Sequence, residues 1–468
     1  MNKLVFALFF GNRGFFPGEL VDGARRDIRA IVHAMGHETI ELEQSLTRFG
    51  AVETMGEGRV YAKFLDENRG KYDGVILSLP NFGDENGAVA ALRDCGVPIL
   101  LQAYPDTIGN MDFANRRDAF CGKLSIADVF RQEGIAFSAI GEHVCHPDSD
   151  EFSRQLSIFA GTCAVVKRMR RLNVGAIGAR TTVFKTIRFD EVALQGCGIN
   201  TETFDLTQLF RYMRNVDPSE EAFVEARKKL INVGNCVDVP AEMMDNQARL
   251  YCALKQIAAE YELGAMAIRC WNELQDEFKI TPCISIGLLN AEGLPVACEL
   301  DVCNAVSMVA LQAASGMPPI CMDWNNNYGS NPDKCILFHC GAVSSCAIEG
   351  KGTVVSHKML DKGKEHLGGI AWGCNQGRVK PGPMTYVSAK TESGRFVTYL
   401  GQGRITEDKI EEAFFGCAGV AEIPELQKTL RGICKNGFRH HVSIVLSHAE
   451  ESLREAFNVY LGYDIIDF

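Results

Sequence analysis

The chain has 468 residues, a length typical of about two to four domains. Its formal net charge of −11 at pH 7 argues against a nucleic-acid or anionic-membrane partner, because binding to phosphate groups needs a basic surface. With 46% hydrophobic and 23% charged residues, the composition is that of a soluble globular protein.

The first apolar run, residues 4–10, has no small-residue cleavage site after it, which predicts a buried strand rather than a signal peptide. No apolar run reaches the roughly 18 residues of a membrane helix. We therefore expect a cytoplasmic protein without a membrane partner. Its 18 cysteines include no Cys-x-x-Cys pair and are expected to be reduced, mostly packed as small hydrophobic side chains.

Residues 1–170 alternate short apolar runs with helical segments, a pattern typical of βαβ units around a parallel sheet. The predicted strands cover residues 4–10, 38–42, 74–80, 98–104 and 135–140, and the longest predicted helices cover 19–35 and 151–172. We expect an N-terminal α/β domain with ligand-contacting loops at the carboxyl ends of its strands, the first of which contains Arg13.

A central α/β domain is predicted over residues 171–347. It starts with the sequence NVGAIGAR, in which Arg180 follows a strand, and continues with helices over 207–214, 219–232 and 240–260. Four or five buried strand candidates then come in quick succession: GAMAIRCW, CISIGLLN, LPVACEL, PPICMDW and KCILFHCG.

Residues 348–468 are rich in glycine and in β-forming residues, with a hairpin predicted around residues 391–394. The predicted fold class is therefore α/β: two consecutive doubly wound, Rossmann-like parallel-sheet domains followed by a β-rich, barrel-like C-terminal domain. This last domain is expected to supply a late histidine to the functional site.

Acidic residues close the apolar runs on either side of a predicted helix. Asp301 is the expected N-cap of this helix, which covers residues 302–315 and ends at a glycine. Read as strand, helix and strand, the segment predicts parallel strands with Glu299 and Asp323 at one edge of one sheet. His339 ends the next strand candidate and is expected at the same edge.

Carboxylates that lie close together and partly buried repel each other, and a divalent cation removes that conflict. Carboxylates with imidazole ligands suit Mn²⁺, Mg²⁺, Co²⁺ or Fe²⁺ better than a metal that prefers thiolates. A further imidazole is expected from His440 or His441, which face opposite sides of a strand. Taken singly, Glu299, Asp323 and His339 also fit a helix-end carboxylate, a turn former and a core histidine; together they favour a metal site.

Residues near these candidates predict a pocket for a sugar. Trp324 and Asn325 lie in the WNNNYG segment directly after Asp323, and Arg269 and Trp271 end another predicted strand. We expect these four side chains to contact the substrate.

At these residues the sequence resembles the L-fucose/L-arabinose isomerase family. The similarity lies in the patterns ACELDVCNAVSMVALQAASG, CMDW, FHCGAV and HHVSIVLSH, and in the order of two α/β domains and a β-rich domain along the chain. The resemblance implies an aldose–ketose isomerase that depends on Mn²⁺. It also implies that Glu299, Asp323 and His441 hold the metal, with His440 as the alternative to His441 and His339 as a further ligand.

Such an enzyme moves a proton between C1 and C2 of the sugar through an enediol, and one carboxylate takes the proton while another returns it. The resemblance assigns these roles to Glu299 and Asp323. It further implies a homo-oligomer, a trimer or hexamer, in which the first domain of a neighbour covers the site and Arg13 contacts the substrate.

The sequence leaves the sugar open, because an Asp as the second acid is typical of the fucose type and a histidine soon after it of the arabinose type. The candidates are L-fucose or D-arabinose, L-arabinose, and a modified hexose such as sulfoquinovose. A sulfonate needs a cationic clamp, for which the available residues are Arg13, Arg180, Arg269, Arg378 and Lys380. The alternatives from other classes are a non-catalytic sugar-binding protein and a thiol-based redox enzyme; the missing Cys-x-x-Cys pair argues against the latter.

Overall fold

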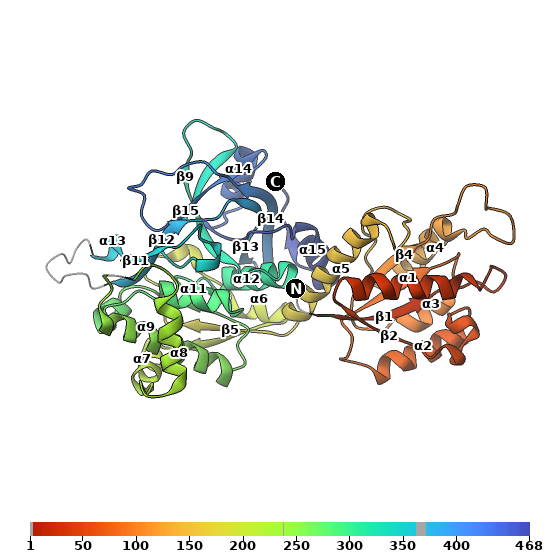
Figure 1. The fold of residues 1–468 in the computed structure, drawn as a ribbon, viewed down its shortest axis with the longest axis horizontal. Helices are drawn as coiled ribbons and strands as arrows, with labels where there is room; N and C mark the ends of the chain where they lie inside the picture. The colour runs from red at the N-terminus through yellow and green to blue at the C-terminus, as the bar shows by residue number, and fades with distance from the viewer. Residues whose placement is uncertain (1–2, 237, 362–370) are drawn as a thin grey trace. The chain divides into compact units, whose positions relative to one another are not determined.

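The computed structural model describes residues 3–236, 238–361 and 371–468 (Figure 1). The chain divides into two compact units. The first comprises Met1–Lys167 and Glu451–Gly462, and the second comprises Arg168–Glu450 and Tyr463–Phe468. No helix within the described ranges is both long enough and apolar enough to cross a membrane.

The first unit is built around a four-stranded parallel sheet in the order β2–β1–β3–β4. Its strands are β1 (Val5–Phe10), β2 (Glu38–Glu41), β3 (Gly74–Leu79) and β4 (Ile99–Ala103), and its helices include α1 (Leu20–Ala34), α2 (Met55–Glu67), α3 (Glu85–Leu92), α4 (Ala119–Gln132) and α5 (Asp150–Met169). Along β1, Phe6 and Leu8 pack in one hydrophobic core, whereas Ala7 and Phe9 pack in another. Both faces of the sheet are therefore covered, as in a doubly wound α/β domain.

The second unit contains another parallel sheet, in the order β6–β5–β7–β8. Its strands are β5 (Leu172–Ile177), β6 (Ile199–Phe204), β7 (Ala265–Ile268) and β8 (Val296–Ala297). The helices around it are α6 (Glu191–Gly196), α7 (Leu206–Asn215), α8 (Glu221–Ile231), α9 (Ala241–Glu260), α10 (Glu273–Phe278) and α11 (Cys283–Ala291). The helices α7, α8 and α9 confirm the three that the sequence predicts for this region.

The segment CISIGLLN, predicted as a strand, is helix α11 (Cys283–Ala291). The prediction is wrong because the segment is apolar almost throughout and nearly all of it is buried. A run of this kind has no periodicity that separates a strand from a helix, and its length suits either.

The remainder of the second unit is a nine-stranded sheet in the order β11–β12–β15–β10–β9–β16–β13–β14–β17. Its strands are β9 (Ile320–Asn327), β10 (Lys334–His339), β11 (Thr353–Ser356), β12 (Trp372–Arg378), β13 (Gly382–Glu392), β14 (Arg395–Ile405), β15 (Cys417–Glu422), β16 (His441–Val445) and β17 (Asp464–Ile465). An additional antiparallel pairing of β14 with β15 closes part of this sheet into a barrel. The fold class predicted from the sequence is therefore confirmed (Figure 1).

The predicted hairpin is the connection between β13 and β14. The φ angles of Ser393 and Gly394 there are 51° and 75°. Consecutive left-handed residues make the tight two-residue turn whose twist matches that of antiparallel strands.

Helix α12 (Val302–Ser315) joins the parallel sheet to the barrel, and it contacts β7 and β8 as well as β13 and β16. The expectation that Glu299 and Asp323 end parallel strands of one sheet is therefore wrong. Glu299 follows β8 of the parallel sheet, whereas Asp323 lies in β9, which runs antiparallel to β10 and β16 of the barrel. The strand–helix–strand pattern is the same in both arrangements, and nothing local decides which sheet the second strand joins.

Candidate active site and metal centre

The backbone reverses sharply where β8 gives way to helix α12. Glu299 and Leu300 have φ angles of 59° and 66°, in the left-handed region that residues other than glycine seldom adopt. Asp301 follows, and its side chain accepts a hydrogen bond from the backbone N–H of Asn304, which caps the helix. Strain of this kind persists where the surrounding structure holds it and is frequent at functional sites.

His441 lies at the centre of a cluster of acidic residues, and it is fully buried. Its Nε2 is 2.8 Å from Oε2 of Glu299 and 3.5 Å from Oδ1 of Asp323. Its Nδ1 is 2.9 Å from Oδ2 of Asp301. The first residue of β16 thus meets carboxylates on both sides of its ring.

The five predicted ligand candidates lie in two groups of three that share His441. Glu299, His339 and His441 each offer a ligand atom within 4.8 Å of the others, and so do Asp323, His440 and His441. His441 belongs to both groups and is buried, whereas the His440 side chain is 41% exposed and belongs to one group. The geometry therefore favours His441 over His440 as the central imidazole.

Opposing effects act on the charges of this cluster. Burial acts to lower the pKa of His441, but its hydrogen bonds to Asp301 and Glu299 outweigh burial and raise this pKa to about 10. Burial acts to raise the pKa of Glu299, but the hydrogen bond and charge of His441 lower it overall. Burial also lowers the pKa of His339 to about 4, so that this imidazole is neutral at pH 7.

Asp323 is the carboxylate without a compensating donor. Burial raises its pKa to about 7, with a further upward contribution from the charge of Glu299 that His441 only partly offsets. Its Oδ1 atom is buried and has no hydrogen-bond partner among the described residues. A buried carboxylate oxygen without a hydrogen bond, beside a second carboxylate and imidazole nitrogens, fits the ligand set of a divalent cation. The residues present therefore suit a metal of the Mn²⁺, Mg²⁺ or Co²⁺ kind.

Two of the residues predicted to contact substrate lie beside the cluster. Trp271 donates a hydrogen bond from Nε1 to Oε1 of Glu299 over 3.3 Å. Arg269 donates to the backbone oxygen of Trp271 and forms an ion pair with Glu273 at 2.7 Å, so that its guanidinium is engaged within its own segment.

The other predicted pocket residues are placed differently. Trp324 donates from Nε1 to the hydroxyl of Tyr399 over 2.9 Å and packs against the barrel core. Neighbouring residues of a strand face opposite sides, so a site-facing Asp323 puts Trp324 on the other face of β9. The structure thus does not bring Trp324 to the cluster. Asn325 is exposed on β9.

Arg13 lies in the first unit, in the loop that follows β1. It forms an ion pair with Glu85, donates from Nε to the backbone oxygen of Gly83, and stacks over the Phe82 ring at 4.0 Å. The loop is therefore firmly held, and the contact of Arg13 with substrate remains a prediction.

The sequence-based reasoning missed Phe184 and Arg439 near the histidines, and it gave Asp301 only the role of a helix cap. Phe184 packs on His440 and His441 with ring centroids 5.3 Å and 5.7 Å apart, although it lies in a loop with no recognisable pattern. Arg439 forms a buried ion pair with Asp301. The signal for this pair was available: an acid lies two residues after Glu299, and an arginine lies two residues before His441.

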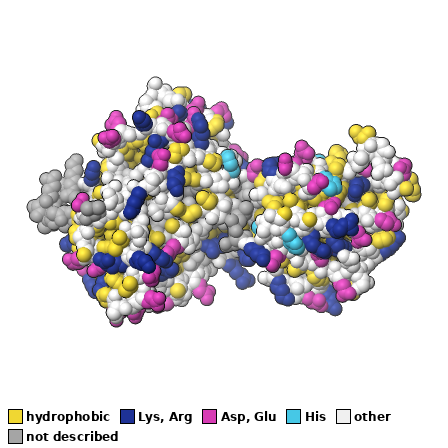
Figure 2. All heavy atoms as spheres, in the orientation of Figure 1, with side chains coloured by type: hydrophobic (Ala, Val, Ile, Leu, Met, Phe, Trp, Pro, Cys, Tyr) yellow, Lys and Arg dark blue, Asp and Glu magenta, His cyan; other side chains and the backbone are white. Residues whose placement is uncertain are grey.

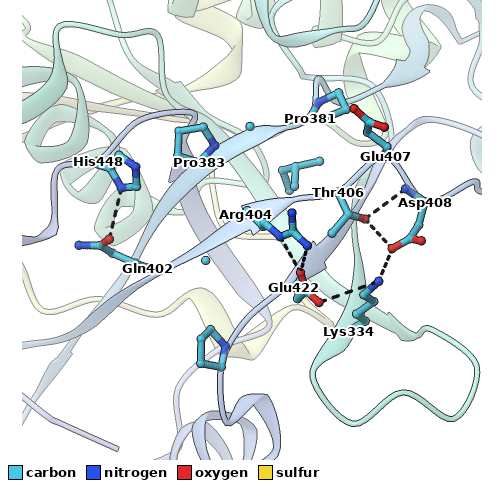
Figure 3. Close-up of a pocket in the computed structure, with 14 residues that line it drawn as sticks. Lys334, Pro381, Pro383, Gln402, Arg404, Thr406, Glu407, Asp408, Glu422 and His448 are labelled. Atoms are coloured by element: carbon cyan, nitrogen blue, oxygen red, sulfur yellow. Dashed lines mark hydrogen bonds and ion pairs between the residues drawn. The ribbon is translucent and has the colours of Figure 1, made fainter.

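A groove of about 1060 Å³ lies elsewhere on the barrel, and none of the cluster residues lines it (Figure 3). Its charged side chains largely neutralise each other. Lys334 pairs with Asp408 at 2.6 Å and Arg404 pairs with Glu422 at 2.5 Å. This groove therefore offers no concentrated charge for a sugar derivative and is not part of the candidate active site.

Comparison with known proteins agrees with this architecture. Residues 7–170 match the N-terminal domain of fucose/sulfoquinovose isomerases, and residues 337–468 match the C-terminal domain of L-fucose isomerase. The sulfoquinovose isomerase of Alkalicoccus urumqiensis is 24% identical over 403 residues, and that of Priestia aryabhattai is 24% identical over 402 residues. Each alignment covers 84% of this chain and 85% of the relative.

The fold, the buried carboxylate–histidine cluster and these similarities define an aldose–ketose isomerase. The chain belongs to the fucose isomerase family, with an N-terminal domain of the fucose/sulfoquinovose isomerase type.

Proposed function

We propose that this enzyme interconverts sulfoquinovose, a hexose with a sulfonate on C6, and the corresponding ketose. The proposal rests on the cluster of Glu299, Asp323 and His441, together with the similarity to sulfoquinovose isomerases. The alignments with these relatives cover most of this chain and most of the relatives. L-Fucose, D-arabinose and L-arabinose, which the sequence patterns also suggest, are the less favoured substrates, because the relatives that align with 84% of this chain are named for the sulfonated sugar.

We further propose that the cluster holds a divalent metal, Mn²⁺ by preference and Mg²⁺ or Co²⁺ as alternatives. Glu299, Asp323 and His441 would be its ligands, because Nε2 of His441 lies 2.8 Å from Glu299 and 3.5 Å from Asp323. His339 lies in one group with Glu299 and His441 and would be a further ligand. When bound, such an ion polarises oxygen atoms of the sugar and stabilises the negative charge that develops on them.

The residues themselves supply the proton transfer. Isomerisation removes a proton from C2 of the aldose and delivers one to C1, so the site needs one group that accepts a proton and another that donates it. Of the two carboxylates Glu299 and Asp323, one would accept the proton and the other would return it. Trp271 donates to Oε1 of Glu299, and Oε2 of Glu299 lies 2.8 Å from Nε2 of His441, so both oxygens of this carboxylate are held in place.

Arg180 is the residue that we propose for the sulfonate. It lies four residues before Phe184 in the loop that covers the two histidines, and the N–H of Phe184 donates to the Thr181 carbonyl within the same turn. Within the described ranges its guanidinium donates hydrogen bonds to the carbonyls of Thr181 and Thr182 and forms no ion pair. A guanidinium without a carboxylate partner can bind a sulfonate through two parallel hydrogen bonds.

Three of the other cations named for the sulfonate have a carboxylate partner; the fourth, Lys380, donates to a backbone carbonyl as Arg180 does but lacks the two parallel donors of a guanidinium. Arg13 and Arg269 form ion pairs with Glu85 and Glu273. Arg378 lies 3.7 Å from Glu349, and Lys380 donates to the carbonyl of Cys346 at 2.6 Å.

We propose that the enzyme is a cytoplasmic homo-oligomer. In the first unit, large apolar side chains are exposed in the segments that follow strands β1 and β4, among them Phe15 at 67%, Ile108 at 96% and Phe113 at 80%. Figure 2 shows hydrophobic side chains on the surface of this unit. Exposed apolar groups gathered at one edge suit a protein partner better than water. Arg13 lies at this edge as well, which supports a subunit arrangement in which it meets a neighbour's substrate.

A panel of aldoses tests the proposed function. Purified protein is stripped of metal, reloaded with Mn²⁺, Mg²⁺ or Co²⁺, and incubated with sulfoquinovose, L-fucose, D-arabinose or L-arabinose, with ketose formation followed by ¹³C NMR. We expect turnover of sulfoquinovose that depends on the added metal. Turnover of an uncharged sugar alone would contradict the sulfonate proposal. The absence of any ketose and of any bound metal would favour a non-catalytic sugar-binding protein.

A further inference from the structure

Asp301 does more than cap a helix. Its Oδ1 accepts from the Asn304 backbone N–H at 3.2 Å and from Arg439, and its Oδ2 accepts from Asn304 Nδ2 at 2.6 Å and from His441 Nδ1 at 2.9 Å. A carboxylate offers about four acceptor positions, and all of them are used here. Because the side chain is completely buried, no water can replace a lost partner.

Arg439 shares this burial, with a side chain that is 2% exposed. It lies two residues before His441, at the start of β16, whereas Asp301 lies two residues after Glu299, at the start of α12. The ion pair therefore ties the barrel strand that carries the histidine to the helix that starts beside Glu299. A buried ion pair is a costly way to gain stability, which suggests a role in fixing a specific arrangement.

We infer that Asp301, held by Arg439, is a positioning residue that fixes the ring of His441 with Nε2 directed toward Glu299 and Asp323. This inference rests on the proposed metal site. The bond from Nδ1–H to Asp301 keeps a proton on Nδ1, so Nε2 would be the nitrogen that offers its lone pair when His441 binds a metal as a neutral imidazole. Carboxylates that orient metal-binding histidines in this way raise metal affinity by about 10- to 100-fold.

A purely structural role is the alternative, because Asp301 caps α12 and neutralises a buried arginine. The variant Asp301→Asn separates these roles. Asparagine is as good an N-cap as aspartate, but it has one acceptor oxygen in place of two and no charge for Arg439. Asp205→Asn is the matched control, since Asp205 caps α7 with its side chain and takes no part in the cluster.

The measurement is the affinity of the full-length, metal-stripped chain for Mn²⁺ alone, by isothermal titration calorimetry, alongside the thermal unfolding midpoint. We expect Asp301→Asn to lose about 10- to 100-fold in Mn²⁺ affinity and Asp205→Asn to lose none. The double variant Asp301→Asn, Arg439→Met removes both buried charges. We expect the double variant to have an unfolding temperature closer to that of the unmodified chain than the single variant Asp301→Asn has. Its Mn²⁺ affinity should stay low.

Affinity that returns together with thermal stability in the double variant would overturn the inference, as would an Asp301→Asn chain that binds Mn²⁺ as tightly as the unmodified one. Crystal structures of the metal-free unmodified chain and double variant give an independent reading. We expect the His441 ring to leave its position against Glu299 when Asp301 and Arg439 are replaced, and a ring that stays in place contradicts the positioning role. Failure of the unmodified chain to bind Mn²⁺ would instead contradict the proposed metal site, and the ring position would still decide the role of Asp301.

Discussion

Asp323 and His441 are register partners across the antiparallel strands β9 and β16, and the Nε2 atom of His441 lies 3.5 Å from Oδ1 of Asp323. Backbone pairing in the barrel thus sets the distance between a candidate catalytic acid and a candidate metal ligand. Glu299 approaches the same nitrogen from the parallel sheet, at 2.8 Å. The parallel sheet and the barrel of the second unit therefore both contribute residues to one candidate site.

Replacing either acid tests the proposed proton transfer. We expect Glu299→Gln and Asp323→Asn each to lower kcat for ketose formation by a factor on the order of 10² to 10⁴, because each variant loses a group that exchanges a proton. Asp333→Asn, at an exposed position just before β10, is the control and should keep full activity. Steady-state kinetics with saturating Mn²⁺ make the measurement. Full turnover by both site variants would mean that other residues carry the chemistry.

The proposed sulfonate contact predicts a change in substrate preference. We expect Arg180→Gln to raise the KM for sulfoquinovose by about 10- to 100-fold, the range expected for lost hydrogen bonds to a charged group. The KM for the analogue without the sulfonate, 6-deoxyglucose, should change little. Arg188→Gln alters an exposed arginine farther along the same loop and should leave both constants unchanged. An equal loss for both sugars would assign Arg180 a structural role.

Metal removal should lower the stability of the folded chain. A cation that binds only the folded state adds about 2.7 kcal/mol at a concentration of 100 times its Kd. Differential scanning calorimetry of the chelator-treated protein, with and without added Mn²⁺, measures this shift. Asp323→Asn should respond more weakly because the cation loses a ligand. An identical shift in that variant would place the stabilising metal elsewhere.

Lys123 in α4 provides a pH-dependent prediction. It is 3% exposed and donates to the His143 carbonyl at 2.8 Å, and burial lowers its pKa to about 8 despite an opposing contribution from Cys145. Between about pH 8 and the unfolded value of 10.5 the unfolded chain binds more protons at this lysine, so its contribution to stability rises with pH in that window and is constant below it.

The expected rise is at most about 3 kcal/mol. Urea unfolding of the unmodified chain and of Lys123→Met at several pH values gives the difference between the two free energies of unfolding. That difference should grow in favour of the unmodified chain from pH 8 to 10. Lys63→Met, at a lysine with a 75% exposed side chain, should show no such trend. A flat difference for Lys123→Met would mean that the lysine is charged in the folded state throughout.

The exposed apolar edge of the first unit predicts an effect on assembly. Replacing Ile108 and Phe113 with serine should lower the mass measured by light scattering, because the subunits would lose apolar area at their interface. Val192→Ser, at a 75% exposed position in α6 of the second unit, is the control. An unchanged mass for the double variant would place the oligomer interface elsewhere.

Much of this architecture was predictable from the sequence. Helical periodicity located α7, α8 and α9, and the turn chemistry of residues 391–394 located the hairpin. The acids and histidines of the cluster stood out because charged groups are rare at the ends of apolar runs. Helix α11 was missed because a buried apolar run has no periodicity to read.

Pairings over long sequence distances were not predictable. The local sequence does not show that the strand containing Asp323 joins the barrel, because its partners, β10 and β16, come later in the chain. Asp301 looked like an ordinary helix cap because its second partner, His441, is 140 residues away. Phe184 gave no signal, since a lone aromatic residue in a loop is compatible with many surroundings.

The left-handed turn at Glu299 and Leu300 makes the proposed site depend on the register of the barrel strands. The turn directs Glu299 from the parallel sheet toward His441 of the barrel. The candidate active site therefore forms only when the barrel strands pair in their observed register. A slip of one residue along β16 would point His441 to the opposite face of the strand and dismantle the cluster. With the proposed site residues, a chain whose β16 had slipped by one residue would lose ketose formation.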